Sequence, residues 1–539
     1  MGAFTKRKPN NAQLPEDEQP QVELAQNQSV VQDEQKVTAL AVAAGFCASL
    51  GGLIFGYVSG EISGFFPMQD YAERFGQRNA DGVYEFSAAR QGTIVGLVSI
   101  GALIGALIAG KMADLLGRRL AISISAFFTC VGTVIEISSS THWVQFAVGR
   151  LVTGLSIGSL SVVVPMYQSE CSPAPIRGVI VSSYQLLITL GIWLAEVVNL
   201  GTSKVSGSAS WRIPNGLSFA WALVLGTLIL FFPESPRYAY GHGRTEEARS
   251  TIAKLAGLPE NSATVEHQIN DLQNKLDEES ELSQEFSFFE IFTGPRMFYR
   301  TMLGIALGTG QQLVGVNYFF YFGTTSFKST GISNSYVTQL ILGSVNVAAT
   351  IVSLWVVGKY GRRPILMIGA FSMMVCFLIY AFVGHFAVDL TNPANSPTTG
   401  SVLIAFSCLS IVAFAMSWGP VVWAVNSELY PLRYRSVCMG LATASNWFWN
   451  FMLSFFTRFI TDEIDYLYGL VFAGCCGAMV LVVFFFVIES KDRTLEEVDL
   501  MYIQHVNPIT SANWDGGAYR KDEGRSTGVD PSPSPMTEA

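Results

Sequence analysis

Charged residues are scarce in this chain of 539 residues, where they make up 14% of the total, against about 25% in soluble domains. Only five histidines are present, and the neighbouring Cys475 and Cys476 lack the spacing of metal ligands. We find no nucleophile motif, metal cluster or phosphate-binding loop. The sequence therefore supports neither an enzyme nor a bound cofactor, and its net charge of −9 gives no sign of nucleic-acid binding.

Long apolar stretches are what the sequence has instead. Hydrophobic residues make up 50% of the chain and the mean hydropathy is +0.35, which is typical of a protein embedded in a lipid bilayer. Stretches of about 20 apolar residues are long enough to cross a membrane as helices. Twelve are predicted, near 39–66, 91–113, 120–141, 144–167, 179–201, 216–232, 298–326, 336–358, 363–386, 401–428, 435–460 and 466–488.

The distribution of Lys and Arg predicts the orientation, because these residues accumulate in cytoplasmic loops. The short loops on one side carry Lys111, Arg118, Arg119, Arg177, Lys359, Arg362, Arg363, Arg433 and Arg435, and those opposite carry Arg74, Arg78, Arg90, Lys204, Arg212, Lys328 and Arg458. Flanking Lys36, Arg237, Arg296, Arg300, Lys491 and Arg493 add to the richer side. We expect both termini and the central loop to be cytoplasmic.

An internal repeat predicts two similar halves of six spans. Three short motifs recur at corresponding places: Gly117-Arg118-Arg119 as Gly361-Arg362-Arg363, Ser169-Glu170 as Ser427-Glu428, and Glu234-Ser235 as Glu489-Ser490. Two homologous halves around a central cavity are one plan of membrane transporters. The predicted parts are a disordered tail 1–38, a first half 39–232, a central loop 233–297, a second half 298–490 and a tail 491–539 that begins helical and is disordered from 504. Short amphipathic helices are predicted in the loop at 245–255 and 264–276.

The apolar stretch 308–322 carries three amide side chains, Gln311, Gln312 and Asn317. An amide without a partner is costly in hydrocarbon, so such groups face a bundle interior or a water-filled path. They could serve only as hydrogen bonds between helices. Gln312 and Asn317 lie about 140° apart on an ideal helix, so one ligand meets both more easily if the helix breaks near Gly315. We predict that break.

The motifs at the ends of the spans carry a family resemblance. They are GxxADxxGRR (110–119), Gly149-Arg150 with Gly154 and Gly158, PMYQSECSPAPIRG (165–178), PESPRY (233–238), GQQLVGVN (310–317), VGKYGRRP (357–364), NSELYPLRYR (426–435) and ESKDRTLEEV (489–498). Over about residues 39–500 the chain resembles the sugar porter family of the major facilitator superfamily, and most of all its fungal hexose transporters.

The resemblance implies an all-α membrane protein of the major facilitator fold, with twelve transmembrane helices in two pseudo-symmetric halves. It implies a monosaccharide transporter, for a hexose such as glucose, that works by alternating access in the plasma membrane as a monomer. The residues at the motif positions that bind sugar are Gln185, Gln311, Gln312, Asn317, Asn346, Trp423, Asn446 and Trp447. Amides suit this task because they both donate to and accept from sugar hydroxyls. Asn446 could instead cap a helix break, and Trp447 could only pack.

Charged residues at the cytoplasmic ends are candidates for a gate. Asp114 and Arg118 are four residues apart and can pair on one helix. We expect ion pairs that form when the cavity faces outward and break when it faces inward, among Asp114, Arg118, Arg119, Glu170, Arg177, Glu234, Arg362, Arg363, Glu428, Arg435 and Glu489. They could also be static links between helices. Gly358 stands where the second repeat would have an acid, so its latch should be weaker.

Proton coupling is left open by the first span. Proton-coupled relatives carry a titratable Asp where this chain has Val58, which favours a facilitative uniporter. Glu61 lies three residues on, and Arg150 matches the Arg that pairs with that Asp, so the two could form a proton site or a fixed ion pair. A proton-coupled hexose symporter that uses Glu61 and a transporter-like glucose sensor are the alternatives. Known sensors of this family have longer tails.

Overall fold

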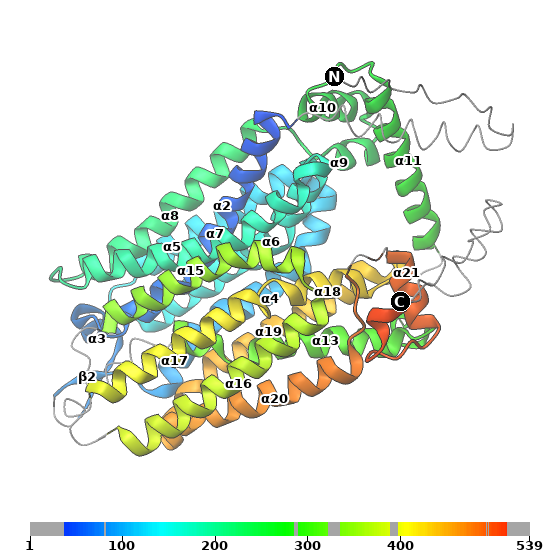
Figure 1. Cartoon of the computed structure of the whole chain (residues 1–539). Helices are drawn as coiled ribbons and strands as arrows, with labels where there is room; N and C mark the ends of the chain where they lie inside the picture. Colours follow the sequence, from blue (N-terminus) through cyan, green and yellow to red (C-terminus); the bar gives the residue numbers. More distant parts are fainter. Residues whose placement is uncertain are drawn as a thin grey trace, which may run out of the picture.

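The computed structural model describes residues 37–79, 82–284, 289–321, 335–388, 397–491, 493 and 495–514. Long helices dominate, and they run side by side in two groups (Figure 1). The two strands of the described chain, β1 (Gln77–Arg78) and β2 (Tyr84–Glu85), form a small antiparallel hairpin. The structure is thus an all-α bundle, as expected.

The first half consists of six long helices. They are α2 (Ala39–Phe65), α4 (Ala88–Leu116), α5 (Arg118–Ser138), α6 (Trp143–Cys171), α7 (Ala174–Thr202) and α8 (Ala209–Leu228), which continues as η1 (Ile229–Phe231). The main contacts are of α4 with α6, of α2 with α7, and of α5 with α6 and α8.

The second half has a matching set of helices. They are α13 (Met297–Leu313), α15 (Ser335–Lys359), α16 (Arg362–Ala387), α17 (Pro397–Met416), α18 (Val421–Leu429), α19 (Leu432–Ile464), η3 (Asp465–Leu467) and α20 (Tyr468–Phe486). Here α16 packs against α20 and α17, and α13 packs against α19.

Short helices mark the two ends of the bundle (Figure 1). At the end where α2 begins lie α9 (Pro236–Gly241), α10 (Thr245–Ala256), α11 (Ala263–Gln284), α12 (Glu290–Thr293), α21 (Leu495–Ile503) and η4 (Ser511–Asn513). We name this end the terminal face. The opposite end, the far face, carries α3 (Gln69–Phe75) and the hairpin. Helices α10 and α11 lie at the two places where short amphipathic helices are predicted.

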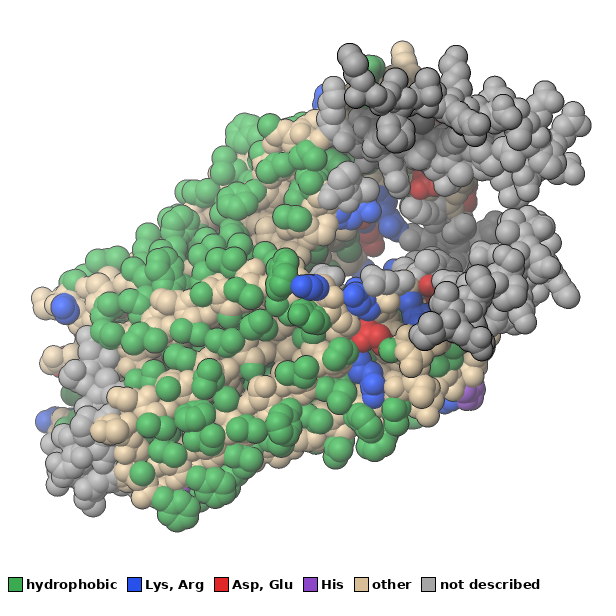
Figure 2. Space-filling view, in the orientation of Figure 1, with side chains coloured by type: hydrophobic (Ala, Val, Ile, Leu, Met, Phe, Trp, Pro, Cys, Tyr) green, Lys and Arg blue, Asp and Glu red, His purple; other side chains and the backbone are tan. Residues whose placement is uncertain are grey.

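The helices are long and apolar enough to cross a membrane. Ten segments of the described chain meet this description, and one of them, Arg433–Phe486, holds both α19 and α20. The predicted span 298–326 begins as α13, and its last residues, 322–326, lie outside the described ranges. Together these segments account for the twelve predicted spans. The face that Figure 2 shows carries many hydrophobic side chains along the helices, as contact with lipid requires.

The predicted span 401–428 matches the candidate membrane segment Thr398–Leu429, and this segment is interrupted inside. Helix α17 ends at Met416 and α18 begins at Val421, directly after Pro420. Proline lacks the N–H that a continuous helix needs. One prediction is wrong in detail. In the tail predicted to be disordered from 504, the described residues include the short helix η4, and the Trp514 carbonyl accepts a hydrogen bond of 2.7 Å from the Arg493 side chain.

Close approach of helices in the first half depends on glycine. The Cα hydrogen of Gly158 in α6 points at α4, where a Cβ atom would overlap the main-chain oxygen of Ala102. In the same way, a Cβ at Gly105 of α4 would overlap the main-chain oxygen of Leu155. Small residues at such contacts let two helices pack backbone to backbone in lipid. This contact makes the first half one closely packed body.

We predict that Gly158→Ala destabilises the protein by about 1–3 kcal/mol, the typical cost of overpacking, because the helices must separate to admit the methyl group. The matched control is Gly110→Ala in α4, where an added Cβ meets nothing within 4 Å. Thermal unfolding in detergent measures both. Equal melting temperatures for the two variants would contradict the packing described here.

Candidate functional site

The break predicted in the stretch 308–322 is present. Helix α13 ends at Leu313, and the chain is helical again from Val316. Between them Gly315 has a φ of 85°, a conformation that favours glycine. A side chain there would also strike the ring of Phe472. The prediction of a break at Gly315 is confirmed.

Gln311 connects this break to the one between α17 and α18. Its Nε2 donates to the main-chain oxygens of Trp418 and Gly419, at 2.9 and 3.0 Å. These carbonyls lie where the helix is interrupted before Pro420, so they need partners other than the helix itself. Gln311 therefore stabilises an irregular backbone segment inside the bundle.

The other predicted amides of this stretch join Gln311 in one hydrogen-bonded cluster. Asn446 Nδ2 donates to Gln311 Oε1 at 2.7 Å, and Gln312 Nε2 donates to Asn446 Oδ1 at 3.0 Å. Gln312 Oε1 accepts from Asn317 Nδ2 at 2.6 Å and from Asn450 Nδ2 at 3.0 Å. We call these five residues the amide cluster. The break at Gly315 is what allows Gln312 and Asn317 to point toward each other.

Sequence reasoning missed three residues at this cluster. Asn450 follows Asn446 by four positions in α19, a spacing that places both on one helix face and could have revealed it. Ser99 of α4 donates to Asn450 Oδ1 at 2.5 Å, and Tyr321 also contacts Asn450, at 3.4 Å. Because α4 belongs to the first half and α19 to the second, the Ser99–Asn450 bond joins the two halves beside the amide cluster.

The remaining predicted sugar contacts lie outside the hydrogen-bonded cluster. The indole of Trp447 is buried against first-half residues, with its ring 5.5 Å from that of Phe55. Gln185 lies in α7, Asn346 is buried in α15, and Trp423 is half-buried in α18. Among the described contacts, no side-chain hydrogen bond links these last three to the amide cluster.

The two halves meet near the far face and part at the terminal face. Helix α4 packs against α19, and α7 packs against α15. Trp193 donates to Ser344 Oγ at 2.9 Å, and Tyr336 donates to the carbonyl of Gly64 at 2.9 Å. Figure 2 shows Lys and Arg side chains around a hollow between the halves at the terminal face. The structure is therefore closed at the far face and open at the terminal face.

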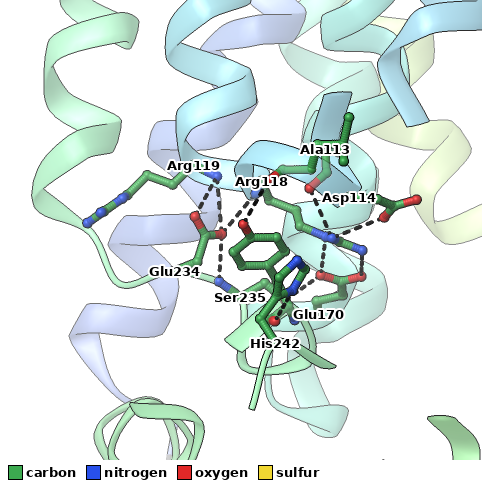
Figure 3. A network of polar contacts seen from close by, with 10 residues as sticks. Ala113, Asp114, Arg118, Arg119, Glu170, Glu234, Ser235 and His242 are labelled. Carbon is green, nitrogen blue, oxygen red and sulfur yellow. Dashed lines mark hydrogen bonds and ion pairs between the residues drawn. The ribbon is translucent and has the colours of Figure 1, made fainter. Parts of the chain in front are cut away.

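A charged network holds the terminal ends of the first-half helices (Figure 3). Glu234 accepts hydrogen bonds from the main-chain N–H groups of Arg118 and Arg119, the first residues of α5, at 3.0 and 3.2 Å. A carboxylate at a helix N-terminus is favourable because it satisfies free N–H groups and the helix dipole. Arg118 pairs with Glu170 of α6 at 2.9 Å, and Ser235 donates to Glu170.

The second half repeats this network residue by residue. Glu489 accepts from the N–H groups of Arg362 and Arg363 at 2.9 and 3.2 Å. Arg362 pairs with Glu428 at 3.0 Å, and Ser490 donates to Glu428 at 2.6 Å. The sequence repeat thus corresponds to a repeated set of contacts.

The two networks differ in the number of their ion pairs and in burial. In the first half Asp114 adds a second ion pair to Arg118, at 3.2 Å, and Gly358 supplies no such group in the second. The Arg118 and Glu170 side chains are 8% and 10% exposed, whereas those of Arg362 and Glu428 are 21% and 22% exposed. Less contact with water makes an ion pair stronger, so the first network should be the more stable one.

The expected role of these ion pairs as a gate stays a prediction. In this structure the Arg118–Glu170 and Arg362–Glu428 pairs are formed, and both partners of each pair belong to the same half. Arg177 and Arg435 donate to main-chain oxygens five residues earlier, those of Ser172 and Tyr430.

The predicted pairing of Glu61 with Arg150 is present inside the first half. Both side chains are 1% exposed, and Arg150 Nη1 lies 3.4 Å from Glu61 Oε1. Ser218 donates to Glu61 Oε2 at 3.1 Å. A second buried carboxylate, Glu136, went unnoticed in the sequence. Among the described residues, no group of three or more His, Cys, Asp or Glu side chains could hold a metal ion.

Fold and site together define a membrane transporter. Two six-helix halves share a polar cluster at their border, and the molecule is open at one face and closed at the other, as in an alternating-access carrier. The family described as "Sugar (and other) transporter" matches residues 44–502. The chain belongs to this sugar transporter family, and it is a multi-pass membrane protein.

Similar proteins include fungal hexose carriers. The low-affinity glucose transporter HXT1 of Saccharomyces cerevisiae is 42% identical over 469 residues, covering 86% of this chain and 82% of its own. The high-affinity fructose transporter ght6 of Schizosaccharomyces pombe is 41% identical over 479 residues, with 88% of each chain covered. The inward-open structure of the xylose transporter XylE from E. coli has a TM-score of 0.71 at 24% identity, covers 86% of this chain and 99% of its own, and supports the fold.

We predict that Glu170→Gln costs about 2–4 kcal/mol of stability because it leaves the nearly buried Arg118 without its main partner. The matched variant Glu428→Gln should cost less than about 1 kcal/mol, because its pair is half-exposed. Thermal unfolding of the purified protein in detergent measures both losses. A larger loss for Glu428→Gln would show that burial does not set the strength of these networks.

Proposed function

We propose that this protein carries a hexose, with glucose as the first candidate, across the plasma membrane as a facilitative uniporter. The observation that carries the proposal is the amide cluster, which lies on the border between the halves and reaches the first half through Ser99. Similarity to a glucose transporter and to a fructose transporter supports a monosaccharide substrate.

A pyranose fits the chemistry of this border. Its hydroxyl groups both donate and accept, and so do the amides of Gln312, Asn317 and Asn446. In the structure these amides bind one another, and we propose that a sugar takes over part of those bonds. Trp447 and Trp423 would offer indole faces to the C–H side of the ring. Gln185, Asn346 and Gln311 complete the proposed set of contacts.

The proposed conformational cycle is based on the contacts that cross the border between the two halves. The Trp193–Ser344 and Tyr336–Gly64 bonds join the halves near the far face, whereas the described Arg–Glu networks lie within one half. We propose that each half moves as one body, and that the far-face contacts break as the terminal face closes. Both termini are proposed to be cytoplasmic, so that the terminal face is the inner one, and the functional unit is proposed to be the monomer.

The direct test is uptake of labelled sugar into proteoliposomes, with glucose, fructose, galactose and xylose in competition. We predict that Asn317→Ala raises the half-saturating glucose concentration at least tenfold, since one lost hydrogen bond to a sugar is worth about 1.4 kcal/mol or more. The control Gln504→Ala removes an exposed amide at the terminal face and should leave uptake unchanged. Absence of uptake of all four sugars by the folded protein would contradict the proposal and favour a sugar sensor.

Proton symport is the second candidate, and the buried Glu61 favours it. Val58 stands at the position where proton-coupled relatives carry an Asp, and Glu61 is already held by Arg150 and Ser218. We therefore predict that an imposed pH gradient drives no uphill accumulation of sugar. Glucose should only equilibrate across the proteoliposome membrane. Accumulation that Glu61→Gln abolishes would overturn uniport and establish Glu61 as the proton site.

A further inference from the structure

Glu196 is a buried carboxylate that neither the transport cycle nor the sugar site uses. Glu196 lies in the far-face part of α7 and is only 4% exposed. Its side chain faces α15 of the other half. Its Oε2 atom occupies the space where a Cβ atom of Gly343 would stand. The neighbouring bond from Trp193 to Ser344 belongs to the same helix contact. Glu196 is therefore enclosed where the two halves meet.

Buried oxygens without a hydrogen-bond donor occur on both α7 and α15 in the described chain. Among the described residues, none donates a hydrogen bond to Glu196 Oε2, to Asn199 Oδ1 one turn along α7, or to Gln339 Oε1 one turn along α15 from Gly343. The amide orientations are fixed, because Asn199 Nδ2 donates to the carbonyl of Glu61 and Gln339 Nε2 donates to that of Phe319. Within the described ranges, Asn199 Oδ1 and Gln339 Oε1 therefore lack a hydrogen-bond donor, as does Glu196 Oε2.

The charged and titratable groups of the helices around α7 are engaged elsewhere. On α2, Glu61 binds Arg150 of α6, and on α15 the Tyr336 hydroxyl donates to the carbonyl of Gly64. On α8, Arg212 donates to the carbonyl of Ser139. Between residues 336 and 357, α15 has no Asp, Glu, Lys or Arg. No described cation thus pairs with Glu196.

An ionised carboxylate without a partner is strongly disfavoured in a site closed to water, and it becomes neutral by binding a proton. A neutral carboxyl group also supplies the missing O–H donor for this acceptor-rich contact. We propose that Glu196 is a proton-binding site that is occupied while α7 and α15 close the far face and is emptied when that face opens. This inference rests on the alternating-access cycle proposed above.

The proton on Glu196 regulates the cycle and is not carried across the membrane. Opening of the far face exposes Glu196 to the solution on that side, so the proton returns to the side from which it came. The state closed at the far face binds one proton more than the open state. By linkage, falling pH therefore raises the ratio of closed to open molecules, by at most tenfold per pH unit for a single proton.

The test follows this ratio by spin-label distances across the far face in purified protein, with no sugar present. Labels at Val205, after α7, and at Val337, in α15, lie on opposite halves and are both exposed. From pH 8 to pH 5 the fraction at the short distance should rise in the wild type. Glu196→Gln should hold that fraction high at every pH. The control Glu73→Gln, which neutralises an exposed far-face glutamate of α3, should behave as the wild type.

Further outcomes distinguish a failure of the proposed proton site from a failure of the proposed function. Gly343→Ala should favour the open state at every pH, because its methyl group takes the place of the carboxylate. A wild-type fraction that does not change with pH, a pH response that persists in Glu196→Gln, or a dependence on sodium ions in place of pH would overturn the proton site. If the labels respond as expected and the protein transports no hexose, the proton site stands and the proposed function fails.

Discussion

The structure depends on one constraint: a main-chain N–H or carbonyl group at membrane depth must have a hydrogen-bond partner. Straight helices satisfy it by themselves, but this protein breaks two of its helices, at Gly315 and before Pro420. Gln311 lies between the breaks and binds the carbonyls of Trp418 and Gly419. Because Gln311 supplies hydrogen-bond partners for the irregular backbone, Gln312 and Asn317 can converge. The candidate sugar site thus lies where these two helices are interrupted.

The second organising feature is the separation of contacts into those within a half and those between halves. Carboxylates and arginines join helix ends inside each half, through Glu234 and Glu170 in the first and Glu489 and Glu428 in the second. Neutral hydrogen bonds such as that from Ser99 to Asn450 cross the border. Charge-assisted bonds are stronger than neutral ones. Movement between halves should therefore break the weaker set and leave the stronger set intact.

Much of this architecture could be predicted from the sequence. The recurring Gly-Arg-Arg and Glu-Ser motifs indicated two halves, and the angle between Gln312 and Asn317 indicated the break at Gly315. Other contacts between residues far apart in the chain could not be derived from it. Asn450 accepts from Ser99, 351 residues away, and the isolation of Glu196 depends on which face of α15 meets α7. The break before Pro420 had a local signal in Gly419-Pro420, but the apolar run around it favoured one continuous span. Opening of the charged pairs depends on which helices move together. The spacing of the motifs does not reveal this.

The central claim is that a hexose binds at the border amide cluster and replaces bonds that its members make with one another. A cryo-electron microscopy structure of the protein with glucose at saturating concentration tests this most directly. We expect density for the sugar in contact with Gln312, Asn317 and Asn446, with the Gln312–Asn317 bond of 2.6 Å lengthened or exchanged for bonds to sugar hydroxyls. Sugar density elsewhere, with the amide cluster unchanged, would contradict it.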